Sequence, residues 1–578
     1  MKILLLHPGD DLPEGKRCGE WDTIVDFGRA PASTYDSWSK QTGCRVMSLF
    51  DFSEDTHDLR RCRDLLRLGM GHLIDGQGLD WWDVVSLELV PDLLQLMLTD
   101  RLAKLITTPY ELYSSRPLPL ATFLEKRLGV KIEILASVWR SAQQRVRHYA
   151  GVLSRLNSAQ LAQVVQDKFD PFHSMRRRLY RRRFVTNRRP IILLPSAYVN
   201  VSRAAVSYAE LVPNYEFLLV WARRNARLGS LPANVRAAPL DSYFRPTGDN
   251  EADALQAKWR ILKPKLLETA VEFRDADSAG MLDRIPSRLR WAVRIGAAWN
   301  NVFESENITG CLCADDTNPY TRIPLMMAKN KGIPTLACHH GALDSWMTLK
   351  TLQADFYLAK CEMEDDYLQR VCGVEEERIA LARLTQSRTF RSATDRGKAP
   401  WLVFFTEPYQ TAHWRSGEVY RELLPKLWEL AQSCGLTLVF KLHPFESVKS
   451  HRRILRRYLP EHERRIEIVA GPPSAELWRK TRVAMTVQSS TALECAEHGI
   501  PVFLCAWLRD SYSGYVRQYA RFGVGQVLES AEQIAEIPRL LETYDDRPLR
   551  QSAPPTIDSV ELVRLFAGTY SLPVARRA

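Results

Sequence analysis

The sequence lacks several features that mark particular classes of protein. None of its eleven cysteines forms a C-x-x-C pair, which disfavours a zinc ribbon or a disulfide framework and favours reduced thiols. No run approaches the roughly 18 to 20 uncharged apolar residues that cross a bilayer. The opening MKILLLHPGDD is too short and too soon acidic for a signal peptide. These absences predict a cytoplasmic protein.

Length and composition indicate a globular protein of more than one domain. The 578 residues exceed the roughly 250 to 300 that one hydrophobic core usually serves. Hydrophobic residues make up 45% and charged residues 25%, which excludes a disordered or fibrous chain. The net charge of +11 favours an anionic partner. That partner could be nucleic acid, a phospholipid surface or a negatively charged sugar donor.

The N-terminal part alternates short apolar runs with helical patterns. Strands are predicted at Lys2–His7, 191–194, 217–220 and Thr335–Cys338, and helices at 255–267 and 289–303. This alternation is typical of a doubly wound α/β unit. A long helical stretch between about Leu120 and Lys168 is expected to be an elaboration outside the sheet.

A second α/β unit is predicted after a polar segment, QSRTFRSATDRGKAP, that lacks apolar periodicity. We therefore expect a first Rossmann-like domain over 1–387, a linker over 388–400 and a second Rossmann-like domain over 401–578. Its strands and helices are expected at 401–405, 420–433, 436–442, 466–469, 475–480, 483–487, 491–497 and 501–505. The apolar tail at 559–570 could pack against either domain.

The segment LTLVFKLHPFE places Lys441, His443 and Pro444 at the end of a buried strand. Side chains alternate along a strand, so Lys441 and His443 should point the same way at the edge where open α/β sheets bind ligands. A cation and an imidazole there suit a phosphate. His443 could equally close a turn against the proline.

A second motif, MTVQSSTALE, joins a strand to a helix through hydroxyl residues. Ser489, Ser490 and Thr491 lie where a helix start leaves unpaired N–H groups, which favour an anion. Glu494 would share a helix face with Ser490 and could reach a ribose or an acceptor hydroxyl. Ser and Thr are also common helix caps, which is the structural alternative.

Together, KLHP and SSTALECAEHGIPVFLC resemble the donor-binding half of bacterial GT-B glycosyltransferases that build surface polysaccharides. The resemblance is greatest to capsule Kdo transferases and bacterial sialyltransferases, and more distant to CDP-glycerol glycerophosphotransferases. It covers roughly Trp401 to Gln526. In these families the His-Pro pair and the Ser/Thr turn bind cytidine nucleotide, so the resemblance implies that role for His443, Pro444 and Ser489–Thr491.

The first domain holds a strand that runs into His339-His340-Gly341. A similar His-Gly turn in these transferases places the histidine near the reacting groups, so His340 is a candidate base and Gly341 would permit close approach of a ligand. His340 could instead cap a loop. Asp315 and Asp316 follow another short strand and are further catalytic candidates, although paired acids at turns are often only solvated.

Three other sequence signals have structural explanations as well as functional ones. Glu407 ends a strand and could contact a donor or acceptor hydroxyl, or cap the next helix. Asp275-Ala276-Asp277 has the letters of a metal motif but lies beside a helix, so no metal is assigned. The run from Arg176 to Arg189 could meet an anionic membrane or simply be solvated; no nucleic-acid module surrounds it.

The leading prediction is a metal-independent GT-B glycosyltransferase without a cofactor. It would move a CMP-linked acidic sugar, such as Kdo or a sialic acid, to a glycan or glycolipid in capsule or lipopolysaccharide synthesis. One alternative is a UDP-sugar epimerase of the same fold. The other is a basic scaffold that recruits polysaccharide enzymes to the inner membrane, where the chain would be peripheral.

Overall fold

The computed structural model describes residues 1–578 apart from 8–9, 11, 13–19, 29–31, 55, 107–109, 116–117, 119, 136–186, 224–225, 246–249, 342, 344–353, 382–398, 408–415, 509–514, 545–558 and 569–578. The linker predicted over 388–400 and the basic run from Arg176 fall almost wholly outside the described residues. Among the helices that are described, none combines the length and the apolarity that a bilayer crossing requires.

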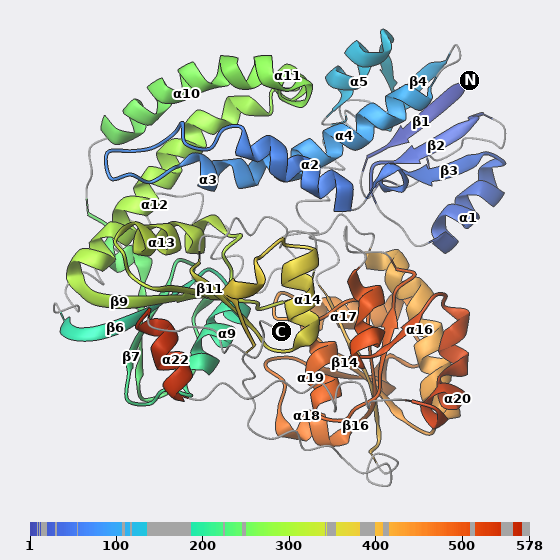
Figure 1. Cartoon of the computed structure of the whole chain (residues 1–578). Coiled ribbons are helices and arrows are strands. Elements are labelled where there is room, and N and C mark those ends of the chain that lie inside the picture. Colours follow the sequence, from blue (N-terminus) through green and yellow to red (C-terminus); the bar gives the residue numbers. More distant parts are fainter. Residues whose placement is uncertain are drawn as a thin grey trace.

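The described part of the chain contains three parallel sheets, with helices between their strands (Figure 1). The first has the order β3-β2-β1-β4-β5. Its strands are β1 (Lys2–Leu6), β2 (Thr23–Asp26), β3 (Arg45–Ser48), β4 (Glu111–Ser114) and β5 (Ile132–Ile134). Helix α1 (Ala32–Thr42) joins β2 to β3, and α5 (Ala121–Leu128) joins β4 to β5. The sequence pattern predicts β1 but not a separate sheet around it.

The second sheet has seven strands in the order β12-β11-β10-β9-β6-β7-β8. They are β6 (Asn187–Ser196), β7 (Glu216–Trp221), β8 (Val235–Pro239), β9 (Glu306–Cys313), β10 (Thr335–Cys338), β11 (Phe356–Ala359) and β12 (Ile379–Leu381). Helix α9 (Val199–Ala209) follows β6, α13 (Pro319–Asn330) follows β9 and α14 (Glu362–Arg370) follows β11. From β6 the chain runs outward through β7 to β8, and from β9 it runs outward in the other direction through β10 and β11 to β12. The point where the direction of winding reverses therefore lies between β6 and β9.

A layer of helices joins the first two sheets (Figure 1). It comprises α2 (Thr56–Arg67), α3 (Trp82–Val85), α4 (Val90–Leu105), α10 (Asn250–Thr269), α11 (Val271–Ser278) and α12 (Ile285–Ser305). Trp82 stacks on Trp259 with ring centroids 5.9 Å apart. The buried Arg322 of α13 pairs with the buried Asp83 of α3. This ion pair ties the helical layer to the second sheet.

The third sheet has the order β15-β14-β13-β16-β17-β18. Its strands are β13 (Trp401–Phe405), β14 (Thr437–Lys441), β15 (Glu467–Val469), β16 (Thr481–Thr486), β17 (Val502–Cys505) and β18 (Gln526–Leu528). Its helices are α16 (Ser416–Ser433), α17 (Val448–Tyr458), α18 (Ala475–Lys480), α19 (Thr491–Glu497) and α20 (Ile537–Glu542). Strands such as β13 are buried along their whole length, because helices cover both faces of a parallel sheet.

The last described helix, α22 (Ser559–Phe566), returns to the second sheet. Leu562, Leu565 and Phe566 are buried there, and the Phe566 ring lies 6.0 Å from that of Phe217 in β7. The expected C-terminal helix therefore packs on the first of the two predicted domains.

The predicted long helix between Leu120 and Lys168 does not form as expected in its first part. Helix α5 ends where Gly129 adopts a positive φ of 68°, and β5 follows directly. The rest of that stretch lies outside the described residues. The predicted fold class is confirmed: the chain is α/β, with the second and third sheets forming two Rossmann-like units that face each other, the GT-B arrangement.

Candidate active site

The second and third sheets meet through their carboxyl edges. The Asn200 amide, at the start of α9, lies 3.4 Å from Nε2 of His443, which follows β14. Beside it, the rings of Tyr198 and Phe445 are 5.7 Å apart. Because ligands of open α/β sheets bind at carboxyl edges, we call the residues gathered here the junction site: Asn200, Arg203, His340, Lys360, Lys441, His443, Glu446 and Glu494.

His443 is held as a neutral imidazole. Burial lowers its pKa to about 4, and the neighbouring Lys441, His340 and Arg203 side chains act in the same direction. Its Nδ1 accepts a hydrogen bond from the Phe445 backbone N–H at 3.3 Å. With Nδ1 accepting, the ring proton lies on Nε2, so the neighbouring Asn200 amide must present its oxygen to this N–H. An anion that replaces the Asn200 amide would accept a hydrogen bond from the same Nε2–H.

Lys441 lies deeper than the sequence predicted. Its buried ammonium donates to the backbone carbonyls of Leu442 at 3.0 Å and Gly471 at 2.7 Å. Burial lowers its pKa to about 8, and nearby Arg203 lowers it further. Lys441 is thus a cation beneath the His443 turn, and it acts on a bound anion through its field.

Glu446 is a junction residue that the sequence analysis did not single out. Its carboxylate accepts hydrogen bonds from the Thr406 hydroxyl and from the backbone N–H of His443 at 3.2 Å. Burial raises its pKa to about 7. The acid therefore fixes the turn that carries His443. Its place three residues after the histidine, in the same motif, was the available signal.

Arg203 was not predicted as a site residue, although it contributes a positive charge from the second sheet. It is half-buried on α9, where burial lowers its pKa and Glu494 opposes that shift. Its charge also lowers the pKa of both His443 and Lys441, which places it close to both. Arg203 is the one charged residue in the helix sequence VNVSRAAVSYA, a signal that could have identified it.

The Ser489–Thr491 turn lies on the same edge of the third sheet as His443, with β13 between their strands. Ser489 Oγ lies 2.9 Å from Thr491 Oγ1 and accepts from the Thr491 backbone N–H at 3.2 Å. This hydroxyl pair caps α19. Ser490 makes no side-chain cap.

Glu494 connects α19 to the junction site electrostatically. Its side chain reaches solvent, but the protein atoms around it displace part of its hydration and raise its pKa. The positive charges of Lys360, Lys441 and Arg203 oppose that shift. Lys360 itself pairs with Glu364 at 3.0 Å. The predicted Glu494 and Lys441 are therefore brought together, and Lys360 and Arg203 join them from the second sheet.

His340 has the opposite proton arrangement to His443. Its Nδ1 lies 2.7 Å from the carbonyl oxygen of Ala314, and a carbonyl can only accept, so Nδ1 carries the proton. The lone pair of Nε2 is then available to take a proton. His340 also contributes to the lowered pKa of His443, so the two imidazoles lie near each other. Among the residues that the structure describes, no atom would lie within 4 Å of a Cβ built on the adjacent Gly341.

Three predicted carboxylates have internal structural roles. Asp315, 5% exposed, accepts from the N–H and hydroxyl of Thr317. Asp316, 1% exposed, accepts from the Tyr357 hydroxyl at 2.7 Å. Buried Glu407 joins β13 to β16 by accepting from Thr486 Oγ1 at 3.0 Å and the Gln488 N–H at 2.8 Å. These contacts give each side chain a place in the fold, and the catalytic roles of Asp315 and Asp316 and the hydroxyl contact of Glu407 stay predictions. Pro444 is half-buried in the His443 turn.

A cluster of possible metal ligands within the described residues lies far from the junction in the chain. Glu54, His57 and Asp58 have ligand atoms within 4.8 Å of one another. The Arg101 guanidinium already pairs with Asp58 and lies 3.5 Å from Glu54. A metal ion bound here would be repelled by the positive charge of the Arg101 guanidinium, so the cluster does not fit a metal. Asp275 and Asp277 lie within α11.

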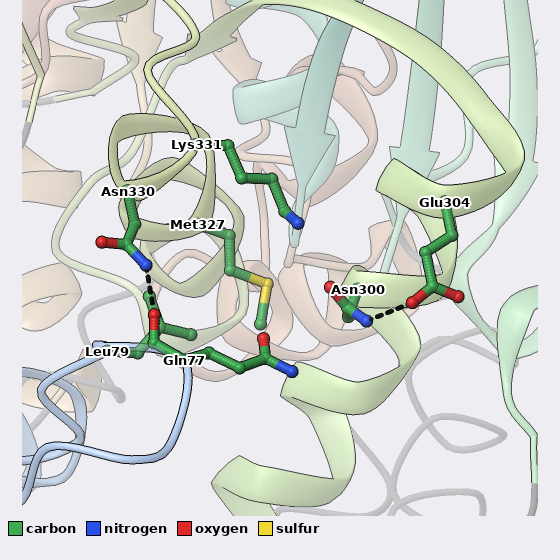
Figure 2. Close-up of a pocket in the computed structure, with 7 residues that line it drawn as sticks. All are labelled: Gln77, Leu79, Asn300, Glu304, Met327, Asn330 and Lys331. Atoms are coloured by element: carbon green, nitrogen blue, oxygen red, sulfur yellow. Dashed lines mark hydrogen bonds between the residues drawn. The ribbon is translucent and has the colours of Figure 1, made fainter.

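A small pocket of about 260 Å³ opens at the other edge of the second sheet (Figure 2). It is lined by Gln77, Leu79, Asn300, Glu304, Met327, Asn330 and Lys331. Helices α12 and α13 end here, just before β9 and β10 begin. The pocket therefore lies at the amino edge of the sheet and does not contribute to the junction site.

No known protein family matches the chain, and no curated protein sequence is similar to it. Solved structures show weak likenesses. The wall teichoic acid polymerase TagF, as a histidine variant soaked with CDPG, is 11% identical, with a TM-score of 0.39, over 75% of this chain and 98% of that one. The UDP-GlcNAc 2-epimerase of Methanocaldococcus jannaschii is 9% identical, with a TM-score of 0.40, over 66% and 99%. MurG of Acinetobacter baumannii is 10% identical, with a TM-score of 0.35, over 67% and 96%. Likenesses this weak assign neither a substrate nor a reaction.

Proposed function

We propose that this protein is a glycosyltransferase that moves a sugar from a nucleotide-activated donor to a glycan or glycolipid acceptor. The observation that carries the proposal is the pairing of two imidazoles with opposite proton positions at one junction of two sheets. His443 offers an N–H to an anion, and His340 offers a lone pair to a hydroxyl. Transfer of a sugar from a phosphate to an alcohol needs both functions.

The reaction divides between the two sides of the junction. His340 Nε2 takes the proton of the acceptor hydroxyl as the acceptor oxygen forms its bond to the anomeric carbon. The bond from that carbon to the donor phosphate breaks, and its electron pair goes to the phosphate oxygen. The negative charge that grows there is stabilised by the His443 Nε2–H and by the positive charges of Lys441 and Arg203.

The donor class follows from the KLHP and Ser-Ser-Thr motifs and their resemblance to cytidine-nucleotide transferases. We propose a CMP-linked acidic sugar, such as Kdo or a sialic acid. The cations at the junction suit a donor with negative charge on both its phosphate and its sugar. Ser489, Ser490, Thr491 and Glu494 are the proposed contacts to the nucleoside side of the donor.

Nucleotide binding tests the proposal directly. We expect CMP to raise the melting temperature of the protein more than CDP, UDP or GDP, because a ligand that binds only the folded state stabilises it. His443→Ala should reduce the CMP affinity at least about tenfold, since it removes a hydrogen bond to a charged group. The exposed His72→Ala serves as the matched control. The ligand-free melting temperature reports on the fold of each variant.

A rise in melting temperature with UDP alone would favour the epimerase. No rise with any nucleotide would favour a scaffold. Unchanged CMP affinity in a folded His443→Ala protein would remove the histidine from the donor site.

Nucleotide affinity should also depend on Lys441 through pH. Its pKa of about 8 means that the ammonium is charged below that pH and neutral above it. The attraction for a phosphate is therefore present at neutral pH and lost as the pH rises through about 8. We expect CMP affinity, measured by titration calorimetry, to fall above about pH 8 by up to tenfold per pH unit. Lys441→Met should bind more weakly at neutral pH and show no such fall. A fall of the same size in the variant would mean that another group titrates.

A further inference from the structure

Helix α17 and the turn after it concentrate positive charge on one surface of the third sheet. Residues 449–465 include seven Lys and Arg against two Glu, a net charge of +5 where the whole chain carries +11. Six of the seven side chains are exposed. We call them the basic face: Lys449, Arg453, Arg456, Arg457, Arg464 and Arg465.

The helix is sharply two-sided. His451 and Leu455 are each 1% exposed and pack toward the sheet, and the α17 part of the basic face lies on the opposite side. Because residues three and four apart share a helix face, Lys449, Arg453, Arg456 and Arg457 form one continuous strip. Val448, 42% exposed, adds an apolar side chain at its start.

The seventh cation, Arg452, fixes the turn beside the helix. Its guanidinium donates to the carbonyl oxygens of Glu463 at 2.8 Å and Ile466 at 2.9 Å. The Glu463 side chain lies 3.7 Å from Arg452 and 3.6 Å from Arg456. This buried acid offsets about one of the two positive charges beside it, an offset that the net charge of +5 already includes. The fold thus holds Arg464 and Arg465 next to the α17 strip.

We propose that the basic face docks on an anionic lipid surface. Clusters of four to eight Lys and Arg on an amphipathic helix bind such surfaces, because each cation near the charged leaflet adds to the attraction. Single-stranded nucleic acid would instead need open aromatic rings for base stacking. The Tyr458 ring is half-buried with the Arg457 guanidinium 5.4 Å above it, and Arg465 lies 5.2 Å over buried Trp428.

Docking here has a consequence for the proposed transfer. Helix α17 begins five residues after His443, so its first turn lies next to the junction site. A lipid surface against the basic face would hold that site beside a glycolipid acceptor. This consequence rests on the proposed function, whereas the docking itself does not.

Vesicle sedimentation of the full chain tests the docking. The probes are vesicles of phosphatidylcholine alone and of phosphatidylcholine with phosphatidylglycerol. We expect binding to the anionic vesicles only, and weaker binding at high salt. The triple variant Arg453→Gln, Arg456→Gln, Arg457→Gln should lower the vesicle partition coefficient at least about tenfold. A matched control removes three exposed cations from the helical layer, with Arg260→Gln, Lys265→Gln and Arg290→Gln.

Four results would overturn the docking proposal. Three are equal binding to neutral vesicles, equal loss in the control variant, and unchanged binding of the α17 variant, which would point to another cation-rich segment such as the Arg176–Arg189 run. A fourth is loss of single-stranded oligonucleotide binding by the α17 variant when the native chain ignores vesicles. The CMP melting shift, measured on the same proteins, separates a failure of docking from a failure of the proposed function.

Discussion

His340→Ala is expected to slow sugar transfer by about 10²- to 10⁴-fold while leaving the affinity for CMP nearly unchanged. The Ala314 carbonyl holds the proton of His340 on Nδ1, so Nε2 is the atom that can accept the proton of an acceptor hydroxyl. Removal of the imidazole leaves water as the base. The measurement is the rate of sugar transfer at saturating donor, together with CMP binding by calorimetry.

The control variant is His72→Ala, which removes an exposed imidazole. It should keep full activity. His340→Ala with full turnover would exclude His340 as the base. A loss of CMP affinity as large as the loss in rate would instead place the imidazole in the donor site.

Asp83→Ala is expected to lower the free energy of unfolding by about 3–5 kcal/mol, the usual cost of leaving one partner of a buried ion pair without the other. The Arg322 guanidinium is completely buried and pairs with Asp83 at 3.0 and 3.3 Å. Without the carboxylate, the positive charge of Arg322 would stay unpaired in the protein interior, or water would have to enter the contact between α3 and α13. Either outcome destabilises the folded state. Urea denaturation followed by tryptophan fluorescence measures the effect, and Trp82 lies next to the changed residue in the chain.

The double variant Asp83→Ala, Arg322→Met tests whether the unpaired charge causes the loss of stability. It removes both charges, so it should be more stable than Asp83→Ala alone. Glu536→Ala breaks an exposed pair with Arg539 and should change stability by less than about 0.5 kcal/mol. If Asp83→Ala changed stability as little as Glu536→Ala, the buried pair would not hold the two layers together.

The third sheet could be predicted from the sequence nearly strand by strand. Its strands are apolar runs bounded by turn residues, as at Trp401–Phe405, and a parallel sheet covered on both faces demands that pattern. The helices of the same unit have clear 3.6-residue periodicity. Local sequence therefore carried enough information here.

The first sheet was missed for a physical reason. Strands β2, β3, β4 and β5 are three or four residues long, too short for an alternating pattern to emerge. Their pairing joins Lys2 to Glu111, across a long stretch of helices. Such a sheet is defined by contacts distant in the chain. The end of α5, in contrast, had a readable signal in Gly129, a residue that accepts the positive φ of a helix end.

The candidate site was only partly accessible to sequence reasoning. The motifs indicated the carboxyl edge of the third sheet, where His443 and the Ser489 turn both lie. They could not reveal which nitrogen of each imidazole carries its proton, because that depends on the Phe445 N–H and the Ala314 carbonyl. They also made Asp315 and Asp316 catalytic candidates, and they could not show that folding buries both side chains.

The return of α22 to the second sheet means that the polypeptide connects the two Rossmann-like units twice, after Leu381 and again before Ser559. A second covalent connection removes some of the relative motions that a single linker would leave to the two units. Mutations that loosen Phe566 from β7 would therefore widen the range of motion between the units before they unfolded either one.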